Sequence, residues 1–349
     1  MGHLAYPVLG KNLTRSGCGS IAGKVSFLLP AFGSLNPDSL YLSIRSILSQ
    51  KYPLKEVLVA EEHHGEPRFD DVARAAGATY YGYDSRFTGE RYSVGRARNA
   101  ILRLAEGEYV VMQDADIVIP DSEFLGNLTQ ELFSCASHFL ATAPLRHIQK
   151  SEAMEWFERT GNTGDVYGHL SGLQLHDGFL LSNRPYEENE FIVVSHPYNP
   201  AKKDRRYVAR RSLYREYQEN PAKWSGREPL IFTPCVGKYF IAARTEHVLA
   251  VGGYCERYLG WGGEDGDLKW KLSCFLGCRH LLNDYRFSQV HLDHARPYFD
   301  QETYIKAKAL SKSRQEQGLL RAILDDIASS IHLSGLIESR LTCAGGIEG

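Results

Sequence analysis

Val25-Ser26-Phe27-Leu28-Leu29-Pro30 is the stretch of sequence that decides the fold. It is a short, nearly continuous apolar run that ends at a proline, which is typical of a parallel strand buried on both faces. Asn36-Pro37-Asp38 then indicates a helix start, because Asn can cap the first turn and Pro suits the first helical position. Apolar residues share one face of the helix that follows: Leu40, Ile44, Ile47 and Leu48.

The alternation of strand and helix signals continues from this unit to residue 112. Strands are predicted at 57–60, 78–81 and 109–112, and helices at 69–76 and 93–104. Repeated units of this kind form a mostly parallel sheet with right-handed crossovers, flanked by helices, and such sheets bind ligands at the carboxyl ends of their strands. Pro30, Glu61 and Asp114 stand at such ends. The sequence therefore predicts an α/β fold of the Rossmann-like, nucleotide-binding kind.

Two acidic stretches follow. Gln113-Asp114-Ala115-Asp116 comes directly after the strand at 109–112, and Tyr258 to Asp267 contains an aromatic pair, two consecutive glycines and three carboxylates within ten residues. Glycines let a ligand approach the backbone, Trp261 offers a flat apolar surface, and carboxylates bind hydroxyls or accept a proton. Few structural requirements call for this combination, so we interpret both stretches as parts of a site.

Composition restricts the classes to which the chain can belong. Its 349 residues carry a net charge of -2 and are 43% hydrophobic, which gives no general attraction to nucleic acid or to a membrane. No stretch has the pattern of a signal peptide or of a membrane span. The seven cysteines show no paired zinc spacing, and we interpret Cys274 and Cys278 as buried thiols in a reducing cytoplasm.

These residues together resemble family 2 glycosyltransferases of the GT-A fold, over roughly residues 24–143 and 232–296. Residues 25–32 are similar to the family's opening strand and nucleotide loop, and Ala97-Arg98-Asn99 and Asp114-Ala115-Asp116 to its helix motif and DxD element. Glu61-Glu62 stands where the family has an acidic pair, and Trp261-Gly262-Gly263-Glu264-Asp265 resembles the acceptor loop of its galactosyltransferase-like branch. Ala31-Phe32-Gly33 and Glu61-Glu62 depart from the commoner Thr-Tyr-Asn and Asp-Asp.

The resemblance implies a UDP-sugar donor that is bound together with Mn²⁺ or Mg²⁺. Asp114 and Asp116 would give oxygen ligands to a hard cation, which stabilises charge on the leaving diphosphate. His291 or His294 is the expected third ligand, because neutral imidazole suits such a cation. Arg98 has two open interpretations, a diphosphate contact or a brace for the DxD loop, and Asn99 is expected to bond locally. The predicted donor contacts are Pro30, Ala31, Phe32, Glu61, Arg98, Asp114 and Asp116.

On the acceptor side, the resemblance makes Asp265 the general base. Glu264 would bind acceptor hydroxyls, Trp261 would stack on a sugar ring, and Gly262 and Gly263 would complete the acceptor-binding loop. One base suffices because the metal assists the leaving group, whereas a glycosidase needs two carboxylates. Retaining relatives commonly have Asn at this place, so a carboxylate implies inversion of the anomeric centre. Asp267 and also Glu264 have an alternative interpretation, a favourable negative charge at a helix N-terminus.

The sequence thus predicts an inverting hexosyltransferase that moves galactose, glucose, N-acetylhexosamine or a similar sugar to a hydroxyl of a glycan or glycoconjugate, as in polysaccharide biosynthesis. Three alternatives remain open: a catalytically silent sugar-nucleotide or glycan-binding module, a transferase acting on nucleic acid, and a nucleotidyltransferase. The run Lys202 to Arg215 has seven Lys or Arg and one Asp across 14 positions. It predicts either a solvated helix face or a surface for an anionic glycan, lipid headgroup or nucleic acid.

We expect a catalytic domain with appended segments, located in the cytoplasm or peripheral to a membrane. The predicted segments are an N-terminal extension (1–23), a GT-A domain (24–300) with an insertion at about 145–230, a C-terminal helical extension (301–340) and a disordered tail (341–349).

Overall fold

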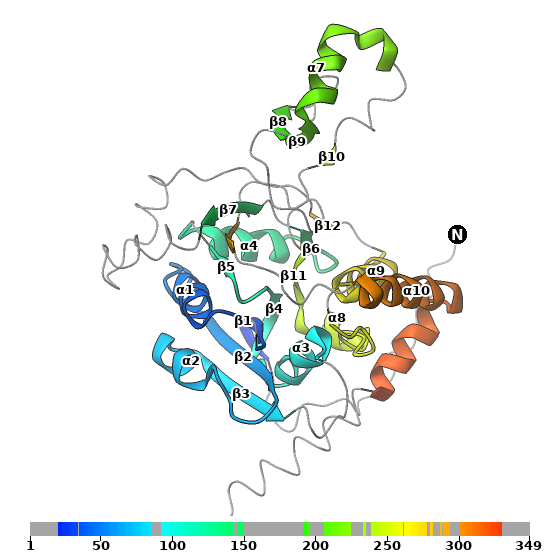
Figure 1. The fold of residues 1–349 in the computed structure, drawn as a ribbon. Coiled ribbons are helices and arrows are strands. Elements are labelled where there is room, and N and C mark those ends of the chain that lie inside the picture. Colours follow the sequence, from blue (N-terminus) through cyan, green and yellow to red (C-terminus); the bar gives the residue numbers. More distant parts are fainter. Residues whose placement is uncertain are drawn as a thin grey trace, which may run out of the picture.

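A seven-stranded sheet forms the centre of the computed structural model, in the order β12-β6-β11-β4-β1-β2-β3 (Figure 1). The structure describes residues 20–33, 35–84, 92–119, 121–142, 145–149, 191–195, 206–224, 233–234, 239–260, 262–277, 280–281, 287, 289–293 and 301–329. The strands of this sheet are β1 (Ile21–Ala31), β2 (Lys55–His63), β3 (Thr79–Asp84), β4 (Gly107–Met112), β6 (Phe139–Thr142), β11 (Tyr239–Arg244) and β12 (His280–Leu281).

The sheet is mostly parallel, which confirms the predicted fold class. β1 pairs in parallel with β2 and with β4, and β2 with β3, whereas β11 runs antiparallel between β4 and β6. The chain runs outward from β1 to β3 and then returns to the other side of β1 as β4. This reversal of strand order creates a switch point at the carboxyl ends of β1 and β4, where open α/β sheets bind their ligands. Ala31 ends β1 there, and Asp114 follows β4.

Helices cover both faces of the sheet because the side chains of β1 alternate between two apolar cores. Phe27 and Leu29 pack with α1 (Pro37–Leu48), α2 (Asp70–Ala76) and α4 (Phe124–Phe133). Leu28 packs on the other face with α3 (Val94–Leu102), α8 (Thr245–Ala250) and α9 (Glu264–Leu276). The predicted starts of α1 and α3 are confirmed: Asn36 accepts a bond from the amide of Asp38 at 2.9 Å, and Ser93 from that of Arg96 at 3.3 Å.

A second, three-stranded sheet adjoins the switch point. It consists of β5 (Ile117–Val118), β13 (Gln289–Asp293) and β7 (Leu145–Gln149), with β13 in the middle. β13 pairs antiparallel with β5, and His291 lies opposite Ile117. A segment near residue 290 is thereby brought beside the DxD stretch, which precedes β5.

A third sheet lies apart from the central body in Figure 1. It contains β8 (Phe191–Ser195), β9 (Arg206–Arg210) and β10 (Thr233–Pro234), and the helix α7 (Arg211–Glu219) and the 3-10 helix η3 (Pro221–Trp224) follow β9. The basic run therefore spans a strand and a helix, and the prediction that it is one helix face was wrong because residues 206–210 pair with β8. Residues 202–205 and the side chains of 206–214 lie outside those described, so the anionic partner stays a prediction.

Two helices complete the described chain, α10 (Gln301–Gln317) and a helix over residues 319–329. Gly318 separates them with a φ of 92°, a left-handed backbone that favours glycine. Ile323 of the second helix packs in the same apolar core as Leu268 and Leu272 of α9. The predicted C-terminal helices are confirmed over residues 301–329, where they pack directly on α9, and the rest of the predicted extension lies outside the described residues.

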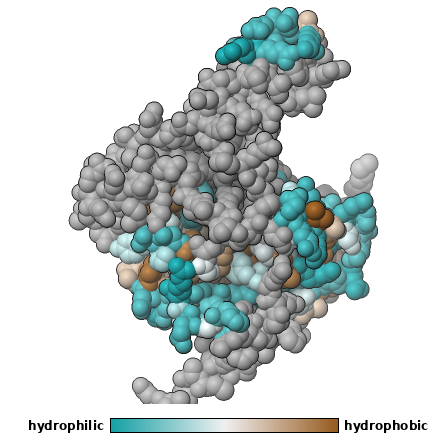
Figure 2. Space-filling view, in the orientation of Figure 1, coloured by the Kyte–Doolittle hydropathy of each residue, from teal (hydrophilic) through white to brown (hydrophobic). Residues whose placement is uncertain are grey.

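None of the described helices could span a membrane. Within the described ranges no helix is both long and apolar enough to cross a bilayer, and the described surface in Figure 2 is largely hydrophilic. Cys274 corrects one prediction, because its side chain is exposed on α9 and is not buried in a core; Cys278 lies outside the described residues.

Candidate active site

Gln113 and Asp116 fix the DxD stretch at the end of β4. The side-chain amide of buried Gln113 donates to the backbone carbonyl of Ile117 at 3.0 Å. It also accepts a 2.9 Å bond from the side chain of Gln289 of β13. The backbone carbonyl of Asp116 accepts a bond from the amide of Leu292 at 3.0 Å. These bonds fasten β13 to the loop, and Nε2 of His291 lies 3.3 Å from Oδ2 of Asp116. The sequence does not show that His291 and Asp116 are neighbours, because they lie far apart along the chain.

Arg98 joins the two acidic stretches. Its guanidinium donates through Nη2 to Oδ1 of Asp114 at 2.8 Å and through Nη1 to Oδ1 of Asp265 at 2.7 Å. The arginine side chain is fully buried, whereas those of Asp114 and Asp265 retain 32% and 16% exposure. One buried cation therefore lies between two carboxylates that reach the solvent-facing side of the site. Arg98 was expected either to contact the diphosphate or to brace the DxD loop, and its described contacts are those of a brace.

Tyr254 contacts both Arg98 and Asp265. Its ring faces the Arg98 guanidinium at 5.1 Å, and its hydroxyl donates to Oδ1 of Asp265 at 3.0 Å. Burial would lower the pKa of Arg98, but Tyr254, Asp265 and Asp114 raise it, and the net shift is upward. Arg98 therefore remains a cation in this buried position.

Asn99 attaches α3 to the segment that carries Tyr254. Its side chain donates to the carbonyl of Tyr254 and to Oε1 of Glu256, both at 2.9 Å, and accepts from the amide of Tyr254 at 2.8 Å. The prediction that Asn99 bonds locally is wrong, because these partners lie about 155 residues away in sequence. Gly253 makes the approach possible, since a Cβ there would lie 2.5 Å from Oδ1 of Asn99.

Two glycines turn the chain into α9 just before its acidic first turn. Gly262 and Gly263 have φ values of 95° and 101°, which L side chains rarely adopt. A Cβ on Gly263 would also lie 2.6 Å from Cε1 of Tyr258. Glu264 and Asp265 therefore begin the helix, where its dipole favours negative charge. Trp261 lies outside the described residues, so its stacking role stays a prediction.

The two acids at the start of α9 are shifted toward their protonated forms. Burial, with the neighbouring charge of Asp265, raises the pKa of Glu264 to about 8, although Arg98 opposes the shift. Burial also raises the pKa of Asp265, and again Arg98 opposes it. The shift favours the protonated form of Glu264, which can donate a hydrogen bond to a ligand.

The donor groups near the DxD stretch suit a hard divalent cation in kind. Carboxylate oxygens of Asp114 and Asp116 and the imidazole of His291 are ligands that Mn²⁺ accepts. Among the side chains that the structure describes, no three His, Cys, Asp or Glu are grouped to hold an ion by themselves. His294 lies outside the described residues. A cation here would need oxygens of the donor diphosphate or His294 to complete its ligand shell.

The predicted nucleotide side consists of the end of β1 and its neighbours. Pro30 and Ala31 lie buried at the end of β1, and the ring of Phe32 lies 4.5 Å from that of Tyr92. Glu61 is buried and already bonded: it accepts from the amides of Arg68 and Phe69, and from the hydroxyl of Tyr80 at 2.6 Å. These contacts give Glu61 a structural role at the start of α2. Its neighbour Glu62 forms a buried pair with Arg96 at 2.7 Å.

Sequence patterns missed several members of this site. Tyr254 and Gln289 help to position its acids, yet each is a single aromatic or polar residue without a motif of its own. Gln113 stands in the DxD stretch, but its bond to Gln289 has no sequence signal. Asp267, for which a helix N-terminal role was considered, is buried and paired with Arg314 of α10 at 2.7 Å. One signal for these contacts was present in the sequence. The first turn of α9 contains three acids, which is more than helix capping requires.

Residues 26–173 match the model of the family described as Glycosyl transferase family 2. This segment of the chain is therefore similar to a glycosyl transferase family 2 domain. The matched segment includes Arg98, Asp114 and Asp116 but ends before α9, so the galactosyltransferase-like second half stays a prediction. No curated protein sequence matches the chain.

Solved structures of low similarity cover most of the chain. A mannosyltransferase from Pyrobaculum calidifontis in complex with GDP-Man and Mn²⁺ is 14% identical, over 92% of this chain and 79% of that one, with a TM-score of 0.44. Glucosyl-3-phosphoglycerate synthase from Mycobacterium tuberculosis is 13% identical over 88% and 80%, with a TM-score of 0.37. TarS from S. aureus is 15% identical over 82% and 64%, with a TM-score of 0.40. At such values these likenesses carry no argument about the substrate or the metal of this chain.

Proposed function

We propose that this chain is a metal-dependent, inverting glycosyltransferase that transfers a hexose-type sugar from a UDP-sugar to a hydroxyl of a glycan or glycoconjugate. The family 2 domain supports the transfer chemistry. The observation that carries the proposal is the Arg98 bridge, because it joins Asp114, at the switch point, to Asp265, at the start of α9. A donor-side acid and an acceptor-side acid thus meet at one place.

On the donor side, Asp114, Asp116 and His291 would hold the cation against the diphosphate, with His294 as a further candidate ligand. The bound cation supplies Lewis-acid stabilisation of the leaving diphosphate. Pro30, Ala31 and Phe32, at the carboxyl end of β1, would line the place of the nucleoside. We assign no donor contact to Glu61, because its carboxylate is already engaged with Arg68, Phe69 and Tyr80.

On the acceptor side, Asp265 would take the proton of the attacking hydroxyl. Arg98 and Tyr254 both donate to Oδ1, so we assign Oδ2 to the acceptor. Arg98 fixes the carboxylate in the site, and a raised pKa makes it a stronger base than an exposed aspartate. Protonated Glu264 would donate to a neighbouring acceptor hydroxyl, and Trp261, with Gly262 and Gly263, would complete the acceptor wall.

Release of UDP from a panel of UDP-sugars tests the proposal. We expect release with at least one hexose donor, dependent on Mn²⁺ or Mg²⁺ and abolished by EDTA. Asp114→Ala and Asp116→Ala should each lower it by about 100-fold or more, since each removes a predicted metal ligand. Asp71→Ala is the matched control, because Asp71 is exposed on α2, and it should release UDP like the wild type.

Other results would point elsewhere. Tight binding of UDP with Mn²⁺ but no release from any donor would indicate a silent binding module. Release of pyrophosphate instead of UDP would indicate a nucleotidyltransferase. Full activity in either Asp114→Ala or Asp116→Ala would refute the metal assignment.

Asp265→Asn separates the base from the rest of the site. Asn retains an oxygen to accept from Arg98 and Tyr254, so the geometry should persist while the proton acceptor is lost. We expect transfer to fall by about 10² to 10⁴-fold, with UDP affinity, measured by calorimetry in Mn²⁺, within about threefold of the wild type. An Asn variant with normal turnover would remove Asp265 from the role of base.

A further inference from the structure

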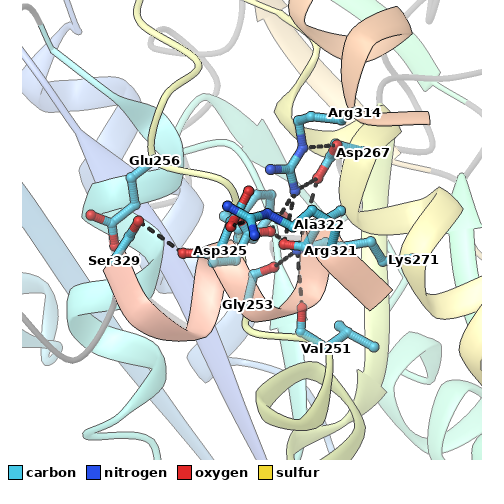
Figure 3. A network of polar contacts seen from close by, with 12 residues as sticks. Val251, Gly253, Glu256, Asp267, Lys271, Arg314, Arg321, Ala322, Asp325 and Ser329 are labelled. Atoms are coloured by element: carbon cyan, nitrogen blue, oxygen red, sulfur yellow. Dashed lines mark hydrogen bonds and ion pairs between the residues drawn. The ribbon is translucent and has the colours of Figure 1, made fainter. Parts of the chain in front are cut away.

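A buried network of charges fastens the first half of α9 to the C-terminal helices (Figure 3). Arg314 of α10 donates through Nε to Oδ1 of Asp267 at 2.7 Å and through Nη2 to Oδ2 at 3.1 Å. Nη2 also donates to Oδ2 of Asp326 at 2.6 Å, and Asp326 accepts a second bond from Lys271 of α9. Lys271 further donates to the carbonyls of Val251 and Gly253, at 3.1 and 2.7 Å. Two cations and two anions balance within this network.

The first turn of α9 is consequently held from two opposite sides. Successive residues of an α-helix point about 100° apart, so Asp265 and Asp267 point about 160° apart around the axis. Asp265 meets Arg98 of α3 and Asp267 meets Arg314 of α10, each at 2.7 Å. Both arginines are at most 1% exposed. The turn that carries the proposed base therefore lies between two buried guanidinium groups.

α10 also packs directly on the glycine loop that precedes this turn. A Cβ on Gly260 would lie 2.9 Å from Cγ2 of Thr303, and one on Gly263 would lie 3.4 Å from Cβ of Ala307. Ala307 and Tyr258 belong to one small apolar cluster, and the hydroxyl of Tyr258 donates to Oδ1 of Asp267 at 3.3 Å. The loop, the first turn of α9 and α10 thus form one packed unit.

Stability alone does not explain a network of this kind. Removing charges from water is costly, and apolar residues of similar volume often replace a buried ion network with no loss of stability. What a bidentate arginine adds is a fixed distance and angle between two elements. Here it fixes α10 relative to a helix turn whose other side carries Asp265.

We propose that Arg314 is a positioning residue for the transfer reaction, and that α10 is an integral part of the acceptor side of the site. The inference rests on the proposed function in that it takes Asp265 to be the base. Arg314 acts through Asp267, which sets the depth and rotation of the first turn of α9. A displacement of about 1 Å at a reacting group can lower turnover by about 100-fold.

Hydrogen exchange of backbone amides gives a test that needs no substrate. In Arg314→Met we expect amides 267–272 of α9 to exchange at least about 10-fold faster, with β1 and β4 unchanged. Asp326→Asn should give the same pattern in weaker form, because Asp267 keeps its bonds to Arg314. Arg321→Met is the matched control on the same surface: Arg321 is 68% exposed and pairs with Asp325 at 2.9 Å, and its loss should leave α9 unchanged.

Turnover per UDP-binding molecule gives the second readout, since it removes any loss of folded protein from the comparison. With the donor that releases most UDP, we expect kcat of Arg314→Met to fall by about 10 to 100-fold while UDP affinity in Mn²⁺ stays constant. Arg314→Lys keeps the charge but cannot bind Asp267 in the same bidentate way, so it should recover part of the loss. The kcat values of Arg321→Met and the wild type should agree within about twofold.

Faster exchange confined to α10 and residues 319–329, with kcat per binding molecule unchanged, would overturn the inference, because the network would then only hold the C-terminal helices in place. A wild type that releases no UDP would instead contradict the proposed function. The exchange pattern of α9 would still decide whether Arg314 fixes that helix.

Discussion

Arg98 shows at the scale of one residue how a buried charge can organise a site. It lies on α3, between a strand-end acid and a helix-start acid that are about 150 residues apart in sequence, and its two Nη atoms contact one carboxylate each. An unpaired cation at zero exposure would be strongly destabilising, so the arginine requires both partners as much as it positions them. The Asp114 and Asp265 carboxylates are correspondingly kept apart by the width of one guanidinium.

Glu264 leads to a prediction about pH and stability. Its pKa is raised from the ordinary 4.5 to about 8 in the folded protein, chiefly by burial. The folded state therefore retains a proton that the unfolded state releases, and stability falls as the pH rises from about 5 to 8, by at most about 1.4 kcal/mol per unit. Glu264→Gln is neutral throughout, so its advantage in Tm over the wild type should grow across this range.

Thermal unfolding at pH 5.5, 7 and 8.5 measures this difference. Glu246→Gln is the control, because Glu246 is 72% exposed on α8, and its Tm should follow that of the wild type at every pH. A constant difference between Glu264→Gln and the wild type would show that Glu264 titrates normally in the fold.

At the scale of elements, the start of α9 depends on the backbone of Gly263. Its φ of 101° is unfavourable for an L side chain, and a Cβ would meet the ring of Tyr258 at 2.6 Å. We expect Gly263→Ala to lower stability by about 1 to 3 kcal/mol and to impair transfer more than UDP binding, since the glycine precedes the acidic turn directly.

Gly266→Ala is the matched control for that variant. It lies in the same first turn with no atom within 4 Å of a new Cβ and no positive φ. Alanine is favoured over glycine in a helix by about 1 kcal/mol, so this variant should melt at or above the wild-type Tm. Urea unfolding of both variants decides the point, and equal effects at the two glycines would contradict a special backbone at Gly263.

The sequence predicted those elements whose local signals agree with their tertiary roles. Residues 25–31 of β1 are all buried and nearly all apolar, and Asn36 and Ser93 cap the helices that they were predicted to start. α2 is a different case: the amides of Arg68 and Phe69, which directly precede it, donate to Glu61 of β2, so a residue predicted to bind the donor also holds the start of that helix. A cap supplied from a distant strand has no local signature.

The partners of the site acids could be predicted even less. Arg314 lies in a largely polar helix, where a solvated position is the ordinary expectation, and only the packing of α10 on α9 buries it. His291 reaches Asp116 because β13 pairs with β5, an antiparallel contact between segments about 170 residues apart. Motif spacing located the acids, whereas their cationic and hydrogen-bonding partners depend on long-range packing.

At the scale of the whole molecule, the C-terminal helices share one core with α3, α8 and α9. Ile323 packs with Leu268, Leu272 and the α3 side chains, and Asp326 and Arg314 complete the charge balance of α9. The sequence predicts a boundary at residue 300, with a helical extension over residues 301–340 after it. The packing instead favours a single cooperative unit that extends at least to residue 329.

Truncation tests this organisation. A chain that ends at residue 300 would expose the apolar face of α9 and leave Asp267 and Lys271 without Arg314 and Asp326. Each buried side chain lost is worth about 2 to 5 kcal/mol against a total of about 5 to 15, so we expect an insoluble product or a fall in Tm of at least about 10 °C. A chain lacking only 341–349, the predicted tail, is the control and should keep the wild-type Tm by circular dichroism. A product ending at 300 that melts like the full chain and binds UDP equally would restore the division into a catalytic domain and an appendage, because the core on the α9 side of the sheet would then be complete without residues 301–329.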